Sequence, residues 1–127
     1  MQSLTPYLLV GIGGMAGAVL RYAVSLAGQF ITTGFPFATL TVNILGSFLI
    51  GLFAELSATT TLISPEMRLL LATGLCGGFT TFSSFMYEIH GLLQDGQIFY
   101  ASLYIGLSAV GGFLALYCGI LFSKIWS

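Results

Sequence analysis

The sequence predicts an all-α integral membrane protein with four transmembrane helices. Of its 127 residues, 57% are hydrophobic and 6% are charged, whereas about 25% of the residues in an ordinary soluble domain are charged. The mean hydropathy is +1.01. Three Lys or Arg and four Asp or Glu residues are too few to cover a soluble domain of this size. The net charge of -1 also provides no basic surface for nucleic acid.

Four apolar segments are long enough to cross a bilayer, since a spanning helix needs about 20 residues. They cover residues 6–30, 38–56, 66–93 and 98–125. The polar connections between them are "TTGFPF", "SATTTLISPE" and "QDGQ". In the second connection, Ser64 and Pro65 are typical of an N-cap followed by the first helical residue. We therefore expect residues 1–127 to form one four-helix transmembrane domain, a multi-pass protein of the inner (plasma) membrane.

The basic residues give the chain almost no preferred orientation in the membrane. Arg68 and Lys124 fall on the side that holds both termini, and Arg21 lies nearer the opposite side. Because the Lys and Arg bias sets orientation, insertion in one direction and insertion in both directions remain open. Dual insertion permits an antiparallel dual-topology homodimer. Gly13 and Gly17 form a small-xxx-small pair, which favours close helix contact.

The stretch "GLCGGFTTFSSF", residues 74–85, places glycines and hydroxyls inside the third span. Glycine weakens a helix by about 1 kcal/mol relative to alanine, so Gly74, Gly77 and Gly78 predict a break in the third helix. Unwound backbone at membrane depth is tolerated only where it is buried in protein or lines a cavity. Carbonyl groups freed there suit a cation. Hydroxyl donors follow the glycines at Thr80, Thr81, Ser83 and Ser84.

Two phenylalanines in the same stretch, Phe82 and Phe85, are three residues apart and share one helix face. A phenyl ring has a positive edge, so the two ring edges can face a small anion without a formal charge, which would hold the anion too tightly. The alternative is an ordinary stripe that packs against lipid or a neighbouring helix. The spacing alone leaves both interpretations open.

Further polar side chains lie at membrane depth, where each calls for a partner or a role. Asn43 in the second span is either an interhelical hydrogen-bond partner or a ligand group. Tyr104 and Ser108 lie one turn apart on the fourth span. Arg21 and Glu88 are the deepest charges, and we expect both to be structural.

The two cysteines, Cys76 and Cys118, lie in apolar runs. We expect them to be small buried residues rather than a disulfide or a metal site.

Taken together, these residues resemble the Fluc family of fluoride channels, also called CrcB proteins. The resemblance covers essentially the whole chain, in order, with four spans. It is carried by "GGMAGAVLRY" (Gly13 to Tyr22), "GFPFATLTVNILGSFLIG" (Gly34 to Gly51), "TGLCGGFTTFSSF" (Thr73 to Phe85) and the Tyr104–Ser108 pair. The third of these is the most specific.

The resemblance implies an antiparallel dual-topology homodimer with two fluoride pores, each built from both subunits. It implies a passive channel that exports cytoplasmic fluoride down its electrochemical gradient. The fluoride pore would use Asn43, Phe82 and Phe85, with Thr81, Ser83, Ser84, Tyr104 and Ser108 as further polar groups. Related sequences often carry serine where this chain has Gly112, which shortens the expected row of hydroxyls.

A structural sodium ion is also implied by the resemblance. The backbone carbonyls of Gly77 and Thr80 from both subunits would hold Na+ at the centre of the dimer. Arg21 would be structural rather than a fluoride ligand. The implied partners are therefore fluoride, sodium, a second copy of the chain and the lipid bilayer.

Two other classes of protein compete with this interpretation. A small four-span proton-coupled multidrug transporter needs an acidic residue in its first span, and this chain has none there. A small accessory membrane subunit explains the hydrophobicity and the glycines, but it does not explain Asn43 together with Phe82 and Phe85. An enzyme is not expected, because no nucleophile–base–acid set lies at membrane depth.

Overall fold

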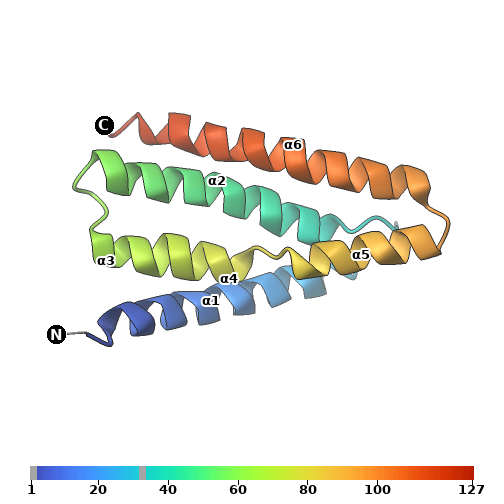
Figure 1. The fold of residues 1–127 in the computed structure, drawn as a ribbon, viewed down its shortest axis with the longest axis horizontal. Coiled ribbons are helices and arrows are strands. Elements are labelled where there is room, and N and C mark those ends of the chain that lie inside the picture. The colour runs from blue at the N-terminus through green and yellow to red at the C-terminus, as the bar shows by residue number, and fades with distance from the viewer. Residues whose placement is uncertain (1–2, 32–33) are drawn as a thin grey trace.

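The computed structural model describes residues 3–31 and 34–127, and this part of the chain folds into four spanning helices (Figure 1). The first is α1 (Thr5–Gly28), the second is α2 (Phe37–Thr59), and the fourth is α6 (Ile98–Ser123). The third span covers Pro65–Gln94. The four predicted spans are confirmed, with ends that differ from the prediction by a few residues. Residues 32 and 33 of the predicted "TTGFPF" turn lie outside the described residues.

Local sequence signals set where the helices begin and turn. The backbone N–H of Met67 donates to Ser64 Oγ over 3.1 Å, which is the predicted N-cap of the third span. Gly34 and Gly96 have φ angles of +74° and +73°, in the left-handed region that glycine enters without steric cost. Both termini and the connection from the second to the third span lie at the same end of the molecule (Figure 1).

The third span is the irregular one. It consists of α3 (Pro65–Arg68), the π-helical segment η1 (Leu69–Cys76), α4 (Gly77–Phe79) and, after an interruption at residues 80–82, α5 (Ser83–Gln94). Thr80 is extended there, with φ -85° and ψ 161°. The predicted break is therefore confirmed, but it follows the glycines instead of occurring at them.

Those glycines bring the third span against α1. A Cβ atom placed on Gly17 would lie 2.7 Å from the backbone nitrogen of Phe79 and would collide with the carbonyl oxygen of Leu75. A Cβ atom on Gly78 would lie 3.0 Å from Cα of Gly14. The two backbones therefore touch directly, as small-xxx-small faces allow. Of the glycines expected to break the helix, Gly74 and Gly78 instead permit this contact, whereas a Cβ atom on Gly77 would meet nothing within 4 Å.

A second pair of helices, α2 and α6, is joined in the same way. A Cβ atom on Gly51 would collide with the carbonyl oxygen of Leu116, and one on Gly119 would collide with that of Phe48. Both helices run toward the end of the molecule that holds the termini (Figure 1), so α2 and α6 are parallel.

The break in the third span is also the place where that span changes its neighbour. Its first part, η1 and α4, packs on α1, whereas α5 packs on α6. Helix α2 contacts both α1 and α6 and lies between the third span and α6 in Figure 1. The interruption at residues 80–82 therefore sits where the two parallel pairs meet.

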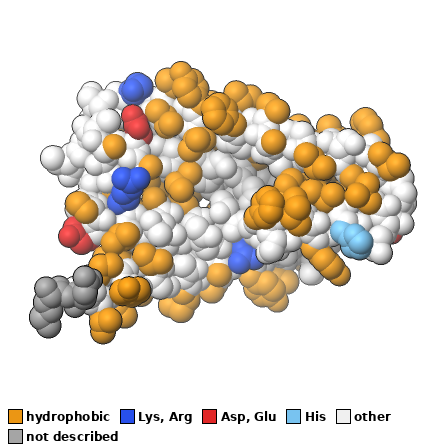
Figure 2. Space-filling model, viewed as in Figure 1, with side chains coloured by type: hydrophobic (Ala, Val, Ile, Leu, Met, Phe, Trp, Pro, Cys, Tyr) orange, Lys and Arg blue, Asp and Glu red, His pale blue; other side chains and the backbone are white. Residues whose placement is uncertain are grey.

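Most of the apolar surface faces outward. No more than 22% of the most apolar window of any span is buried inside the chain. Figure 2 shows hydrophobic side chains along the whole visible face, with charged side chains mostly near the end that holds the termini. Such a surface suits contact with lipid and with other transmembrane helices. Cys76 is buried as expected, but the expectation was wrong for Cys118, which is exposed on α6.

Candidate functional site

The side chain of Asn43 bonds to the backbone where the third span is interrupted. Its Nδ2 donates to the carbonyl oxygen of Thr81 over 3.0 Å, and its Oδ1 accepts from the backbone N–H of Thr81 over 2.8 Å. In a continuous helix, these two backbone groups would bond to residues four positions away. The amide of Asn43 therefore replaces both helical partners of one residue at the interruption.

Other donors are redirected at the same place. The backbone N–H of Ser84 donates to Thr81 Oγ1 over 3.2 Å. Arg21 reaches across from α1, and its Nε donates to the carbonyl oxygen of Gly78 over 3.0 Å. Both hydroxyl and backbone amide of Thr80 donate to the carbonyl oxygen of Cys76, each over 3.0 Å. The backbone around the break is thus held by side chains from α1 and α2.

This redirection changes what two carbonyl groups can do. The N–H of Thr81, which a continuous helix would give to Gly77, goes to Asn43 instead. The N–H of Ser84, which would serve Thr80, goes to the hydroxyl of Thr81. The carbonyl oxygens of Gly77 and Thr80 therefore lose their helical donors, and carbonyl oxygen is a suitable ligand for a hard cation.

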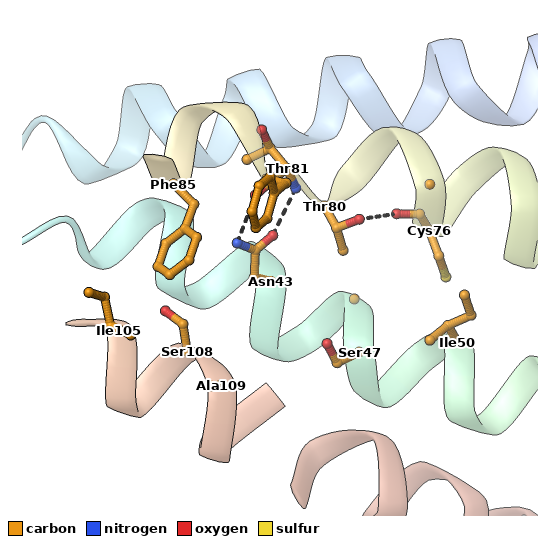
Figure 3. Close-up of a pocket in the computed structure, with 13 residues that line it drawn as sticks. Asn43, Ser47, Ile50, Cys76, Thr80, Thr81, Phe85, Ile105, Ser108 and Ala109 are labelled. Atoms are coloured by element: carbon orange, nitrogen blue, oxygen red, sulfur yellow. Dashed lines mark hydrogen bonds between the residues drawn. The ribbon is translucent and has the colours of Figure 1, made fainter. Parts of the chain in front are cut away.

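A cavity of about 460 Å³ opens beside the break, between α2, α4, α5 and α6. Figure 3 shows Asn43 on α2, Phe85 on α5 and Ser108 on α6 converging on it. Most of its lining is apolar, with a few polar groups, as is common for ligand sites. Seven of the predicted site residues line this cavity: Asn43, Gly77, Thr80, Thr81, Phe82, Phe85 and Ser108.

Ser108 stands out among the lining residues. Its Oγ is buried and, among the described residues, has no hydrogen-bond partner. A serine in a helix often donates to a carbonyl of the preceding turn, and a buried unpaired hydroxyl costs about 1–3 kcal/mol. Ser108 therefore brings to the cavity lining a hydroxyl that no described residue satisfies.

The two phenylalanines lie together at this cavity. The ring centroids of Phe82 and Phe85 are 6.1 Å apart, with an angle of 57° between the rings. Phe85 also packs edge-to-face with Tyr104, at 4.9 Å and 76°. The Phe85 ring is therefore held in orientation by a fully buried tyrosine, whereas the Phe82 ring is 72% exposed on the single chain.

A hydrogen-bonded cluster around Glu88 lies next to these rings. Tyr104 donates from its hydroxyl to Oε1 of Glu88 over 2.7 Å, and Thr39 donates to Oε2 over 2.9 Å. Both oxygens of the carboxylate are therefore engaged, and the hydroxyl proton of Tyr104 points at Glu88. The family resemblance placed Tyr104 in the fluoride pore. Thr39 was not among the expected site residues, and its only signal in the sequence was its position one turn before Asn43 on the same helix face.

A second, smaller cavity of about 130 Å³ lies on the other side of this region. It is lined by Arg21, Ser84 and Glu88, among others, and Thr81 lines both cavities. Ser84 therefore lines a different cavity from Phe82 and Phe85. Ser83, the first residue of α5, is exposed and is not among the residues that line these two cavities.

The chain matches one family model, described as "CrcB-like protein, Camphor Resistance (CrcB)", over residues 8–120. A relative from Chlorobaculum tepidum is 61% identical over 119 residues, which is 94% of each chain. One from Chlorobium phaeobacteroides is 60% identical over 120 residues, again 94% of each chain. One from Geobacter sulfurreducens is 42% identical over 123 residues, 95% of this chain and 98% of its own.

Each of these three relatives is named "Fluoride-specific ion channel FluC". The expectation that this chain is not an enzyme is therefore confirmed. The four apolar helices and this relationship make the chain a multi-pass membrane protein, which in a bacterium resides in the plasma membrane. The family match covers most of the chain and the relatives align with nearly its whole length, so the chain belongs to the CrcB-like protein family.

Proposed function

We propose that this protein is a passive, fluoride-selective ion channel. The observation that carries the proposal is that Asn43, Phe82, Phe85 and Ser108 line one cavity between α2, α5 and α6, and that the buried Ser108 hydroxyl has no partner among the described residues. The cavity offers hydrogen donors and aromatic rings without a lysine or arginine among its lining residues. The relatives named as fluoride-specific channels support the identity of the ion.

Fluoride is small and holds its water tightly, so a pore must replace that water with other donors. The second hydrogen on Nδ2 of Asn43, the hydroxyl of Ser108 and the ring edges of Phe82 and Phe85 supply such donors. Uncharged donors bind the ion without trapping it, and conduction requires both entry and exit. Thr81 lines the same cavity and can act as a further polar group, whereas Ser83, Ser84 and Tyr104 do not line it.

The direction of transport follows from the acid–base chemistry of fluoride. The weak acid HF crosses membranes uncharged and dissociates in a less acidic cytoplasm, which traps the anion. A passive channel lets this fluoride leave down its own electrochemical gradient. The chain carries no phosphate-binding loop ending in Lys-Ser or Lys-Thr, which agrees with transport that uses no nucleotide.

The functional unit in this proposal is an antiparallel dimer with two pores. Two observations support it. Phe82 is 72% exposed on the single chain although it lines the cavity, so a second subunit is needed to enclose the path. The weak bias of Arg21, Arg68 and Lys124 permits insertion in both orientations.

Sodium is the proposed structural ion of this dimer. The carbonyl groups of Gly77 and Thr80 fit such an ion, because their helical donors are redirected to Asn43 and to Thr81. Two carbonyls from each subunit would surround it. Bound there, the ion supplies positive charge that holds the two breaks together, while Arg21 holds the carbonyl of Gly78 within each chain.

Fluoride efflux from liposomes tests the function directly. Vesicles that contain the purified protein and potassium fluoride, opened to potassium with an ionophore, are expected to release fluoride rapidly, and matched vesicles with chloride are expected to retain it. Fluoride release no faster than from protein-free vesicles would contradict the proposal. Reconstitution in sodium-free buffer tests the structural ion separately. Unchanged fluoride release without sodium would contradict the proposed sodium site.

A further inference from the structure

One wall of the cavity changes character a turn beyond Ser108. Ser108 and Gly112 are four residues apart and therefore lie on the same face of α6. Ser108 lines the cavity, whereas Gly112 has no side chain and is not among the residues that line it. If donors continued along α6 alone, the row would end at Ser108.

The opposite wall places a hydroxyl at the level of Gly112. A Cβ atom built on Gly112 would lie 3.5 Å from Oγ of Ser47, in ordinary van der Waals contact. Ser47 is on α2, one turn beyond Asn43, and it lines the same cavity as Asn43 and Ser108. In Figure 3 the Ser47 side chain lies on the α2 wall between Asn43 and Ile50.

The hydroxyl of Ser47 is available to a ligand. Helical Ser and Thr side chains usually donate to a carbonyl of the preceding turn, as Thr59 does to Glu55 over 2.9 Å and Thr80 does to Cys76 over 3.0 Å. Among the hydrogen bonds made by residues 3–31 and 34–127, Ser47 Oγ takes part in none. The side chain therefore faces the cavity with its proton uncommitted.

We infer that Ser47 is a fluoride-binding residue that continues the row of donors across from α6 to α2. The ion passes from the level of Asn43 and Ser108 to the level of Ser47 and Gly112. There the α2 hydroxyl serves in place of a side chain on α6. This inference rests on the proposed fluoride conduction.

Three variants test the inference in the fluoride-efflux assay on intact reconstituted protein. Ser47→Ala is expected to slow fluoride efflux about tenfold or more, since a hydrogen bond to a charged group is lost. Adding Gly112→Ser to that variant is expected to restore most of the rate, because a serine side chain fits beside residue 47 and returns a hydroxyl to this level. Thr41→Ala, which removes an exposed hydroxyl from the same helix, is expected to leave the rate unchanged.

The outcomes separate this inference from the proposed function. If the unaltered protein releases no fluoride, the proposed function fails. If the unaltered protein releases fluoride and the Ser47→Ala protein releases it equally fast, the role of Ser47 is overturned. The same holds if Ser47→Ala slows the release and adding Gly112→Ser does not restore it. Ser47→Thr keeps the hydroxyl and is expected to release fluoride near the rate of the unaltered protein. This result would show that Ser47→Ala acts through loss of the donor and not through damage to packing. Slow release from the Ser47→Thr protein would count against the donor role.

Discussion

Asn43 is the residue on which both the shape of the break and the chemistry of the cavity depend. Both ends of its amide bond to the backbone of Thr81, yet the residue also lines the cavity beside Ser108. Sequence analysis left open whether Asn43 is an interhelical partner or a ligand group. Its contacts establish the first role, and one hydrogen on Nδ2 remains for the proposed second role.

Replacing Asn43 should therefore affect stability as well as conduction. Asn43→Ala leaves the N–H and the carbonyl of Thr81 without partners, and we expect a loss of about 2–4 kcal/mol of unfolding free energy together with slower fluoride efflux. Thermal unfolding in detergent measures the first effect. Gln94→Ala, which removes an exposed amide, is the matched control, and equal melting temperatures for the two variants would contradict the bridging role.

Replacing Phe82, unlike replacing Asn43, should affect conduction but not stability. Its ring is 72% exposed on the single chain, so Phe82→Ile removes little intramolecular packing and should yield a folded protein. Loss of the ring edge is nevertheless expected to abolish fluoride efflux. Tyr87→Ile replaces an aromatic residue on α5 that is 78% exposed, and this variant should conduct normally. Full efflux from the Phe82→Ile protein would rule out the ring-edge role.

At the scale of the elements, the glycines decide how closely the helices approach. A Cβ atom on Gly17 has no space against Leu75 and Phe79, whereas one on Gly11 meets nothing within 4 Å. We expect Gly17→Ala to lower the unfolding free energy by about 1–3 kcal/mol through overpacking, and Gly11→Ala to have no such effect. Chemical denaturation in detergent compares the pair, and equal stability would show that α1 can move away freely.

The spans and the existence of the break could be predicted because composition and glycine content are local signals. The position of the break could not, since Gly74 and Gly78 have another use, in contact with α1. The Glu88 cluster was also beyond prediction, because Thr39 is 49 residues away from Glu88 in the sequence. Asn43, Phe82, Phe85 and Ser108 were gathered by the family resemblance, and the structure brings them to one cavity.

At the scale of the whole molecule, the single chain leaves most of its apolar surface uncovered. Its spans bury at most 22% of their most apolar windows, and its cavity is left open beside an exposed Phe82.

A chain that forms an antiparallel pair must insert in both directions. Reporter fusions at the C-terminus are expected to appear on both sides of the membrane, as measured by one reporter active inside and another active outside.

A stronger charge bias provides the control for this experiment. Adding two lysines near the C-terminus should drive the fusion to one side and, expressed alone, reduce fluoride efflux. A single orientation in the unaltered chain, with full efflux, would exclude the antiparallel arrangement.

The direct backbone contacts between parallel helices have one further consequence. Gly51 and Gly119 fix how far α2 is displaced along α6, and a slip of one turn would move side chains by about 5.4 Å. Such a slip would carry Ser47 past Gly112 and Asn43 past Ser108. Gly51 and Gly119 do not contact the ion in this proposal, yet they set how the proposed ion-binding groups on α2 and α6 align along the helix axes. The selectivity of the channel should therefore be sensitive to substitutions far from the ion path.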